Sequence, residues 1–387
     1  MAAGKAALLR DEIDEARLLF AEGLTHRPFD AALLHQSAKA SRKAGLVDEA
    51  RMSLEAALAA GADAETVEVE RSLIAAGEGR YDVEEPYLLA RVQAKHPESA
   101  SILEVAAKWY FLKFDLRKTN HCLKLWKELE PDSVGMWQLS GELFIRYHDG
   151  PAAIEAFREG VKRAPTSWSL RSALVGALLE RKQNPKEPKA LLEAMLAERP
   201  DDNLTLVRLG QAAEALGRPE EAAAFYDRAL AKLPNDPHTL SARGALDLDR
   251  GDAAAALPRL ERAVALMPGE QEQILYAYFR CLSRLGRVEE AKPIEERWKR
   301  TNADLKKLYE TARLISGNPD DPELRRSAGE ICLKNRLDQD GLRWLNSALV
   351  IDPGHKATHK TLAEHYRKSG NAELAKAHAA AAGIVLP

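Results

Sequence analysis

The chain has 387 residues, of which 45% are apolar and 30% are charged, with a formal net charge of −3. This balance is typical of a soluble protein and argues against a polyelectrolyte partner, so we expect no nucleic-acid binding. No run approaches the roughly 18 apolar residues of a membrane-spanning helix, and the N-terminus "MAAGKAALLRDEIDEARLLF" is too acidic for a signal peptide.

Prolines recur along the chain at a nearly constant interval. The prolines that show this interval are Pro97, Pro131, Pro165, Pro200, Pro234, Pro268, Pro353 and Pro387. The gaps between the first six of them are 34, 34, 35, 34 and 34 residues, and the last two are again 34 apart. A fixed period of this length predicts a solenoid, in which each unit buries its apolar face against the next.

Other columns appear when these prolines are placed at position 32. Position 8 is glycine or alanine, position 15 is often glycine, position 20 is alanine and position 24 is large, as in Gly141, Gly217, Ala153 and Phe157. Small residues at 8 and 20 let two antiparallel helices approach closely, and glycine at 15 ends the first helix. We expect the large residue at 24 to fill the space between neighbouring helix pairs.

These columns resemble the tetratricopeptide repeat (TPR), whose 34-residue unit has Trp-x2-Leu-Gly-x2-Tyr followed by Ala, Phe, Ala and Pro. The best copy, residues 134–167, carries the matching residues Trp137, Gly141, Phe144, Ala153, Phe157 and Pro165. The resemblance covers nearly the whole chain. It implies an all-α fold, a right-handed superhelical solenoid of antiparallel helix pairs.

The chain divides, in order, into four predicted segments. Residues 1–30 are a partial N-terminal repeat and 31–287 the TPR array, with a lengthened turn or a hinge at 181–189. Residues 288–321 are an extended helix and connector, because apolar residues recur there at helical spacing without a glycine until its end. Residues 322–387 are two C-terminal repeats that join the array through this helix.

The chain begins partway through a first helix, so we expect that upstream sequence has been removed. Resemblance to large bacterial TPR proteins implies that such sequence carries a membrane anchor. The compartment stays open, as does a role as the regulatory or anchoring module of a larger complex.

No motif indicates catalysis. Phosphate loops, His-Glu-x2-His, Gly-x-Ser-x-Gly and Cys-x2-Cys are absent from the sequence. Cys122, Cys281 and Cys332 lie far apart inside predicted helices, which favours free, packed thiols. His355 and His359 could meet a metal, but position 359 is expected to pack between helices. We predict no enzyme activity, no cofactor and no metal.

The resemblance implies that the first helices of successive repeats line a concave groove, through positions near 2, 5, 6, 9, 12 and 13. Carried onto this sequence, these positions give mixed charge: His35, Lys39, Arg42, Arg71, Glu104, Lys108, Phe111, Gln138, Glu142, Arg208, Gln211, Tyr276 and Arg280. The family's carboxylate clamp needs asparagine where Lys39 stands, so recognition of chaperone C-termini is not expected in that form.

One aromatic stretch stands out in an aromatic-poor chain. In "KWYFLKF", residues 108–114, Tyr110 occupies a core column and Phe111 falls at position 12, nearer the groove. Phe111 is therefore either an exposed binding hot spot or part of the packing between repeats.

These patterns predict a non-enzymatic scaffold that holds another protein, or a peptide segment of one, in its concave groove. The alternative is a structural array that self-associates into a homo-oligomer, which the apolar tail "GIVLP" favours.

Overall fold

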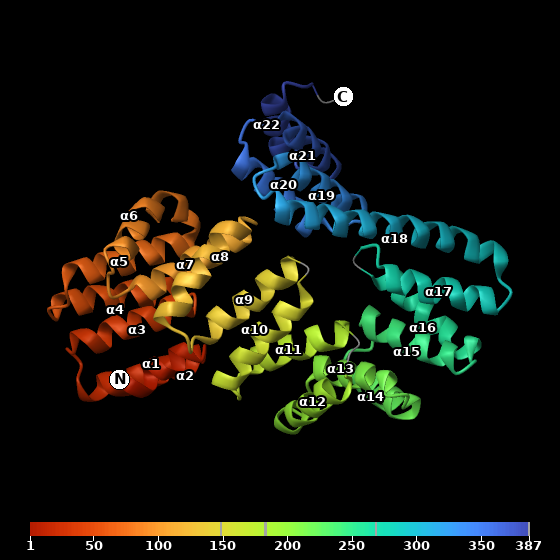
Figure 1. Ribbon diagram of the computed structural model, residues 1–387, viewed down its shortest axis with the longest axis horizontal. Helices are drawn as coiled ribbons and strands as arrows, with labels where there is room; N and C mark the ends of the chain where they lie inside the picture. The colour runs from red at the N-terminus through yellow and green to blue at the C-terminus, as the bar shows by residue number, and fades with distance from the viewer. Residues whose placement is uncertain (148, 182–183, 268, 386–387) are drawn as a thin grey trace. The chain divides into compact units, whose positions relative to one another are not determined.

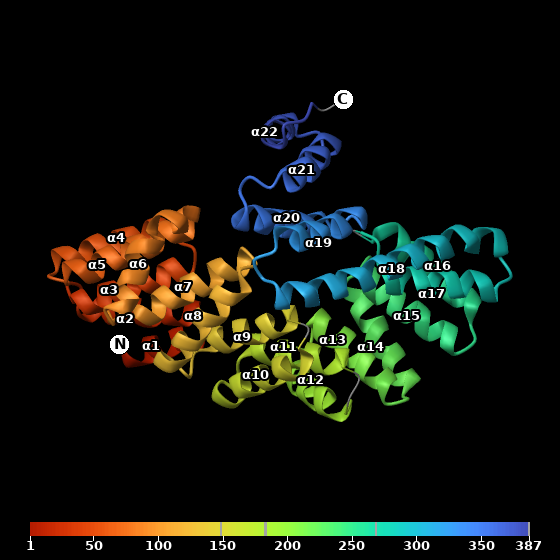
Figure 2. The same cartoon turned by 45° about the horizontal axis from the view of Figure 1, so that its top comes forward.

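The computed structural model describes residues 1–147, 149–181, 184–267 and 269–385. Within these ranges the chain forms helices and no strand (Figures 1 and 2). Its contacts divide it into two compact units, Met1–Ala173 and Leu174–Pro387. The predicted all-α class is confirmed. The four segments predicted from the sequence stay a prediction, because this division follows internal contacts and not repeat boundaries.

Unit 1 contains helices α1 to α10 and the first turns of α11. Their bounds are α1 (Ala2–Leu9), α2 (Ile13–His26), α3 (Ala31–Lys43), α4 (Val47–Ala59), α5 (Ala64–Ala75), the π-helical segment η1 (Ala76–Arg80), α6 (Tyr81–Gln93), α7 (Ser99–Leu112), α8 (Leu116–Leu129), α9 (Val134–Arg146), α10 (Gly150–Arg163) and α11 (Trp168–Glu180).

Unit 2 contains the rest of α11 and the helices that follow it. Their bounds are α12 (Lys186–Glu198), α13 (Asn203–Ala215), α14 (Pro219–Lys232), α15 (Pro237–Asp249), α16 (Ala253–Leu266), α17 (Glu272–Arg284), α18 (Val288–Gly317), α19 (Pro322–Lys334), α20 (Asp338–Ile351), α21 (Lys356–Lys368) and α22 (Ala372–Ala382).

Within each unit the helices pack in sequence order as antiparallel pairs, for example α9 with α10 and α13 with α14. The first helix of a pair also contacts the first helix of the next pair: α3 contacts α5, α7 contacts α9, and α15 contacts α17. First helices therefore lie next to one another along one face, which is the geometry that the repeat pattern predicts.

Positions 8 and 24 of the repeat pack against each other inside one helix pair. A Cβ added to Gly141 would collide with the ring of Phe157, and one on Gly210 would collide with Tyr226. Both aromatic residues are fully buried. The expectation that position 24 fills the space between neighbouring pairs is thus corrected: its large side chain needs the small residue of its own pair.

Turns follow from local chemistry. Gly217 has φ +70°, and at the same repeat position Phe114 adopts φ +57°, so the left-handed turn is kept even where glycine is missing. Asp202 and Ser133 each stand two residues after a repeat proline and accept a hydrogen bond from the backbone of the next helix. Pro268 and Pro387 lie outside the described residues.

The turn between α11 and α12 is longer than its neighbours. α11 ends at Glu180 and α12 begins at Lys186, whereas α13 ends at Ala215 and α14 begins at Pro219. Lys182 and Gln183, which belong to the predicted lengthened turn, lie outside the described residues. Pro188 is buried in the first turn of α12, where proline is tolerated because the backbone N–H has no helical partner there.

The extended helix of the sequence prediction is present as α18, a single helix of 30 residues. Its N-terminal half packs on α17, where Ile294 and Trp298 contact the core, and α18 also packs on α19. The backbone N–H of Glu270 donates to the carbonyl of Asn335 at 2.9 Å, so the loop before α17 contacts the end of α19. The three cysteines are free and buried, as predicted.

Candidate functional site

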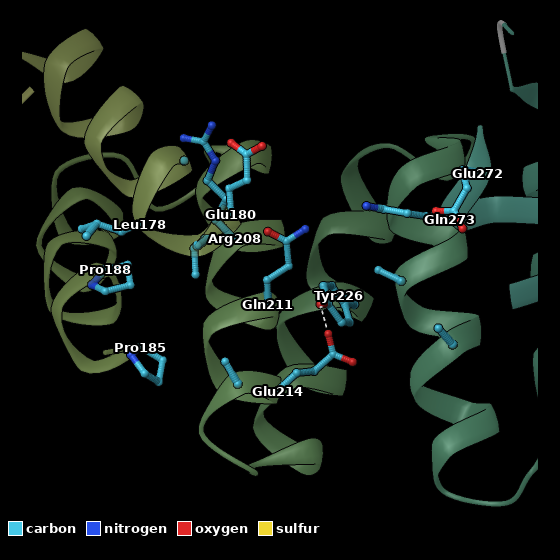
Figure 3. A pocket seen from close by; sticks show the side chains of 15 residues that line it. Leu178, Glu180, Pro185, Pro188, Arg208, Gln211, Glu214, Tyr226, Glu272 and Gln273 are labelled. Atoms are coloured by element: carbon cyan, nitrogen blue, oxygen red, sulfur yellow. Dashed lines mark hydrogen bonds between the residues drawn. The ribbon is translucent and has the colours of Figure 1, made fainter. Parts of the chain in front are cut away.

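An open groove of about 960 Å³ lies in unit 2 along the first helices α11, α13, α15 and α17 (Figure 3). Residues from the turn into α12 and from α14 complete its walls. The lining residues are Gly176, Leu178, Leu179, Glu180, Pro185, Pro188, Arg208, Gln211, Glu214, Ala215, Tyr226, Ala242, Ala245, Glu272 and Gln273. Two of them, Arg208 and Gln211, belong to the set predicted from the sequence.

Arg208 reaches from α13 toward α11. A Cβ on Gly176 would lie 3.1 Å from Nη2 of Arg208, so glycine at this position leaves room for the guanidinium group. Burial lowers the pKa of Arg208, and the Asp202 carboxylate opposes this shift. Arginine nevertheless stays cationic at neutral pH, and the groove has a fixed positive charge here.

Glu214 faces the groove from the same helix. The hydroxyl of Tyr226 donates a hydrogen bond to its carboxylate at 2.6 Å (Figure 3). Burial raises the pKa of Glu214 and only the Tyr226 hydrogen bond opposes this shift. Tyr226 is fully buried and packs on Gly210, so its hydroxyl holds the carboxylate in one position.

Gln211 and three alanines form the middle of the groove. Arg208, Gln211 and Ala215 recur at helical spacing and therefore share one face of α13. Gln211 is exposed, so its amide can both donate and accept hydrogen bonds. Ala242 and Ala245 of α15 have short side chains, which lets another chain approach the helix closely.

At the α17 side of the groove, polar and aromatic groups meet. The indole N–H of Trp298 donates to the Glu272 carboxylate at 2.7 Å. One turn along α17, the Tyr276 ring lies 5.0 Å from that of Trp298 and remains 41% exposed. Arg280 pairs with Asp249 at 2.7 Å and lies 5.6 Å from the Tyr276 ring centroid. The predicted residues Tyr276 and Arg280 thus flank the groove without lining it.

In unit 1 the predicted groove residues are brought together, but they bind one another. Charged pairs of 2.6–2.7 Å join α3 to α5, to the N-cap of α7 and to α7 itself, and one pair lies within α7: Arg42 with Glu70, Lys39 with Glu98, Lys43 with Glu104, and Lys108 with Glu104. His35 is buried beside Glu98, with 4.0 Å between Nδ1 and the carboxylate. This cluster closes much of the face that the repeat pattern offers to a partner.

The pKa shifts of two residues in this cluster follow from burial and from the paired charges. Burial by itself would raise the pKa of Glu104, but the ammonium groups of Lys43 and Lys108 outweigh it and hold this pKa far below its usual range. Burial lowers the pKa of His35, which keeps the imidazole neutral at pH 7. A cavity of about 470 Å³ remains between α1, α3, α7 and residues 129–133, and the paired Lys39, Lys43, Glu98 and Glu104 line it.

The other predicted residues have local partners. Arg71 pairs with Glu55 and Glu68 on the surface, and the Gln138 amide donates to Glu142 at 2.8 Å. Phe111 is buried, with the guanidinium of Arg146 4.7 Å from its ring centroid. Of the two interpretations of Phe111, the structure supports packing and contradicts an exposed hot spot.

Three carboxylates of the groove were missing from the sequence prediction. Glu180 and Glu214 both stand at position 12 of their repeats, a position assigned to the groove, so the repeat pattern could have identified them. Glu272 had no such signal, because its place depends on how the start of α17 contacts α18.

The arrangement is suited to binding. Among the described residues no cluster of three histidine, cysteine or carboxylate side chains could hold a metal ion. His359 is occupied by packing, as its position predicts, since its Nδ1 lies 2.8 Å from Nδ1 of His378 on α22.

Comparison with known families decides the assignment. A family model described as tetratricopeptide repeat matches residues 100–242, and a second model with the same description matches residues 247–311. Together the two models cover more than half of the chain. The chain belongs to the tetratricopeptide repeat family. No curated protein matches the sequence.

Solved TPR structures are similar to it at low identity. PilW, titled a widely conserved type IV pilus biogenesis factor, is 20% identical with a TM-score of 0.46, and the alignment covers 51% of this chain and 91% of PilW. MamA from Desulfovibrio magneticus RS-1 is 19% identical with a TM-score of 0.41, over 43% and 94% of the two chains. YrrB, titled a TPR protein with an unusual peptide-binding site, is 18% identical with a TM-score of 0.30, over 56% and 99%.

TPR proteins generally mediate protein–protein interactions and are typically non-enzymatic scaffolds. Within the described part of this TPR chain, none of the helices combines the length and apolar character that crossing a bilayer requires.

Proposed function

We propose that this TPR protein is a non-enzymatic scaffold that holds an extended segment of another protein in the groove of unit 2. The observation that supports this most directly is the position of the groove, which lies along α11, α13, α15 and α17. These are the first helices of successive repeats, the elements that the family uses for its concave face.

The chemistry of the lining fits an extended peptide. A peptide that is not in a sheet or helix needs partners for its backbone N–H and C=O groups. The amides of Gln211 and Gln273 can provide both kinds of partner, and Ala215, Ala242 and Ala245 leave room for a backbone to come close. The volume of about 960 Å³ lies at the upper end of ordinary ligand sites.

Unit 1 is a weaker candidate for the same role. Lys39, Arg42 and Glu104 each have a charged partner of their own within unit 1, at 2.6–2.7 Å. A ligand that used them would first have to break buried ion pairs, which costs several kcal/mol. The binding set predicted from the sequence is therefore narrowed to Arg208 and Gln211, joined by Glu214.

Site-specific crosslinking tests the proposal. A photoreactive p-benzoylphenylalanine replaces Gln211 in the groove, and in a matched control it replaces Gln339, an exposed glutamine of α20 outside the groove. In cells of the source organism, we expect a discrete protein adduct from position 211 and none from position 339. Equal labelling at both positions, or none at either, would contradict the proposal.

A groove-filling substitution makes the test specific. Ala215 is exposed and lines the groove, so Ala215→Arg should obstruct it without disturbing the core and should abolish the adduct. Ala190→Arg adds the same side chain at an exposed position of α12 that does not line the groove and should leave the adduct unchanged.

A second candidate function is self-association into a homo-oligomer. An apolar groove of about 490 Å³ beside α22 is lined by Ala375, Ala379, Ile384 and Val385, and Val385 is 95% exposed. Light scattering over a concentration series tests this candidate. Val385→Asp should reduce the mass of any oligomer, and Val83→Asp, at a 75% exposed site of α6, is its control. A monomer at every concentration removes the candidate.

A further inference from the structure

We infer that the segment held in the unit 2 groove presents a basic side chain, lysine or arginine, to Glu214 or to Glu272. This inference rests on the proposed function and names the chemistry of its partner. It begins from the charge of the lining, which contains three carboxylates and one guanidinium: Glu180, Glu214, Glu272 and Arg208. At the rim, Asp249 and Arg280 pair with each other and add no net charge.

Two of the carboxylates are held in place by neutral aromatic donors. Tyr226 donates to Glu214 at 2.6 Å and Trp298 donates to Glu272 at 2.7 Å. Each donor occupies one lone pair of a group that can accept about four hydrogen bonds. Within the described part of the chain neither carboxylate has a cationic side chain within ion-pair distance, so both retain the capacity to bind one.

Of the two carboxylates, Glu214 has more to gain from a nearby cation. It is partly withdrawn from water, and its pKa is raised by burial and, to a smaller extent, by the negative charge of Asp249. An ammonium or guanidinium group from a ligand would compensate the charge of this carboxylate. A carboxylate from a ligand would instead meet like charge, which weakens its binding.

The α17 side of the groove adds an aromatic surface. Glu272 and Tyr276 are four residues apart on one helix and therefore share a face. Tyr276 is 41% exposed, and Arg280 already lies 5.6 Å from its ring centroid, which is a cation–π distance. A cationic side chain bound at Glu272 would therefore lie on the same face of α17 as this exposed aromatic ring.

Arg208 sets the polarity of the site. Glu272 and Gln273 lie at one side of the groove, and Leu178 and Glu180 at the other, where Arg208 reaches toward Gly176 (Figure 3). The Arg208 guanidinium lies toward Glu180 and lowers the net negative charge of the lining there (Figure 3). The excess negative charge therefore falls toward Glu214 and Glu272, where the basic residue of the partner binds.

Peptide pools of defined composition test this inference. Biotinylated dodecapeptides of otherwise random sequence carry a fixed central lysine, arginine, glutamate or leucine, and their binding to the full chain is measured by biolayer interferometry. We expect the lysine and arginine pools to bind about fivefold more tightly than the glutamate pool, as a partly screened ion pair would give. The preference should shrink at high salt.

Matched variants locate the preference. Glu214→Gln combined with Glu272→Gln should remove it, because both groove carboxylates are lost. Glu310→Gln combined with Glu373→Gln removes the same charge at exposed positions outside the groove and should leave it intact.

The outcomes separate the inference from the proposed function. Groove-dependent binding that favours the glutamate or leucine pool, or shows no preference, overturns the inference and leaves the scaffold standing. If no pool binds the native chain more tightly than the groove-filled Ala215→Arg chain, both are overturned. Equal loss of preference in the control pair also overturns the inference, since bulk charge would then explain it.

Discussion

The two units use the same repeat positions for opposite purposes. In unit 1, the charged residues of the first helices pair across α3, α5 and α7, and Glu70 is completely buried. In unit 2, Arg208, Gln211 and Glu214 line an open groove. Residue type at a groove position therefore does not determine whether it binds a partner. A complementary charge on a neighbouring helix is decisive, because a side chain that forms an ion pair within the chain is not available to a ligand.

The largest effect is expected from a substitution that breaks the ion cluster of unit 1. Glu70→Ala leaves the Arg42 guanidinium buried without its 2.6 Å partner, and it should destabilise unit 1 by about 4 kcal/mol. Hydrogen exchange read by mass spectrometry should show loss of protection in α3 to α7. Glu214→Gln in unit 2 is the comparison and should change protection little. Similar losses from both would erase the distinction between the units.

The next effect tests the packing that both units share. Gly141→Leu in unit 1 and Gly210→Leu in unit 2 each drive a side chain into a buried ring, and each should cost about 3 kcal/mol. Urea denaturation followed by hydrogen exchange should place each loss in its own unit. Gly77→Ala, where a Cβ would meet nothing within 4 Å, is the control. A loss of stability in only one of the two leucine variants would show that the repeat cores of the two units are not equivalent.

Acid should affect the contributions of Glu104 in unit 1 and Glu214 in unit 2 in opposite directions. The folded pKa of Glu104 is depressed below the unfolded value of about 4.3, so its contribution is present above that pH and is lost as pH falls through the folded pKa. Burial raises the folded pKa of Glu214, so its ionisation costs stability above that pKa and the cost disappears as pH falls.

Substitution of Glu104 or Glu214 by glutamine tests these opposite pH dependences. Glu104→Gln should flatten the acid-induced loss of protection in unit 1, and Glu214→Gln should slightly stabilise unit 2 at pH 7 but not below about pH 4. Thermal unfolding across a pH series, with hydrogen exchange to assign the unit, gives the measurement. Parallel pH slopes in the two variants would refute the assigned signs.

The smallest effect is expected from removing the hydrogen bond that holds Glu214 in place. Tyr226→Phe removes the 2.6 Å hydrogen bond to Glu214 while the ring still packs on Gly210, and it should cost about 1 kcal/mol. The peptide preference should weaken with it, because the carboxylate loses the donor that holds it. Tyr309→Phe, on an exposed side chain of α18, serves as the control. Unchanged peptide binding in Tyr226→Phe would show that Glu214 needs no positioning.

Much of the architecture could be predicted because each repeat obeys local rules. Small residues such as Gly141 oppose large ones such as Phe157 sixteen positions later, and this spacing is visible in the sequence. The long helix α18 was equally predictable, since a run without glycine or an internal proline beyond its first turns has no reason to end. Position 12 also marked Glu180 and Glu214, although the sequence prediction had not named them.

The candidate site was only partly predictable. Arg208 and Gln211 line the groove as their positions indicate. Lys39, at the position of Gln211, and Arg42, at the position of Glu214, instead form ion pairs within unit 1. Lys39 meets Glu98, which is 59 residues away, and no local pattern encodes that distance.

The amino-acid sequence by itself determined the repeat, its helix pairs, the positions of the turns and the absence of a recognisable catalytic motif. These follow from interactions within about one repeat length, where spacing and geometry are linked. Only the tertiary structure decided which first-helix charges neutralise each other and which remain for a ligand. That choice depends on contacts between helices of different pairs, up to nearly two repeats apart, and small differences in how successive pairs stack determine those contacts.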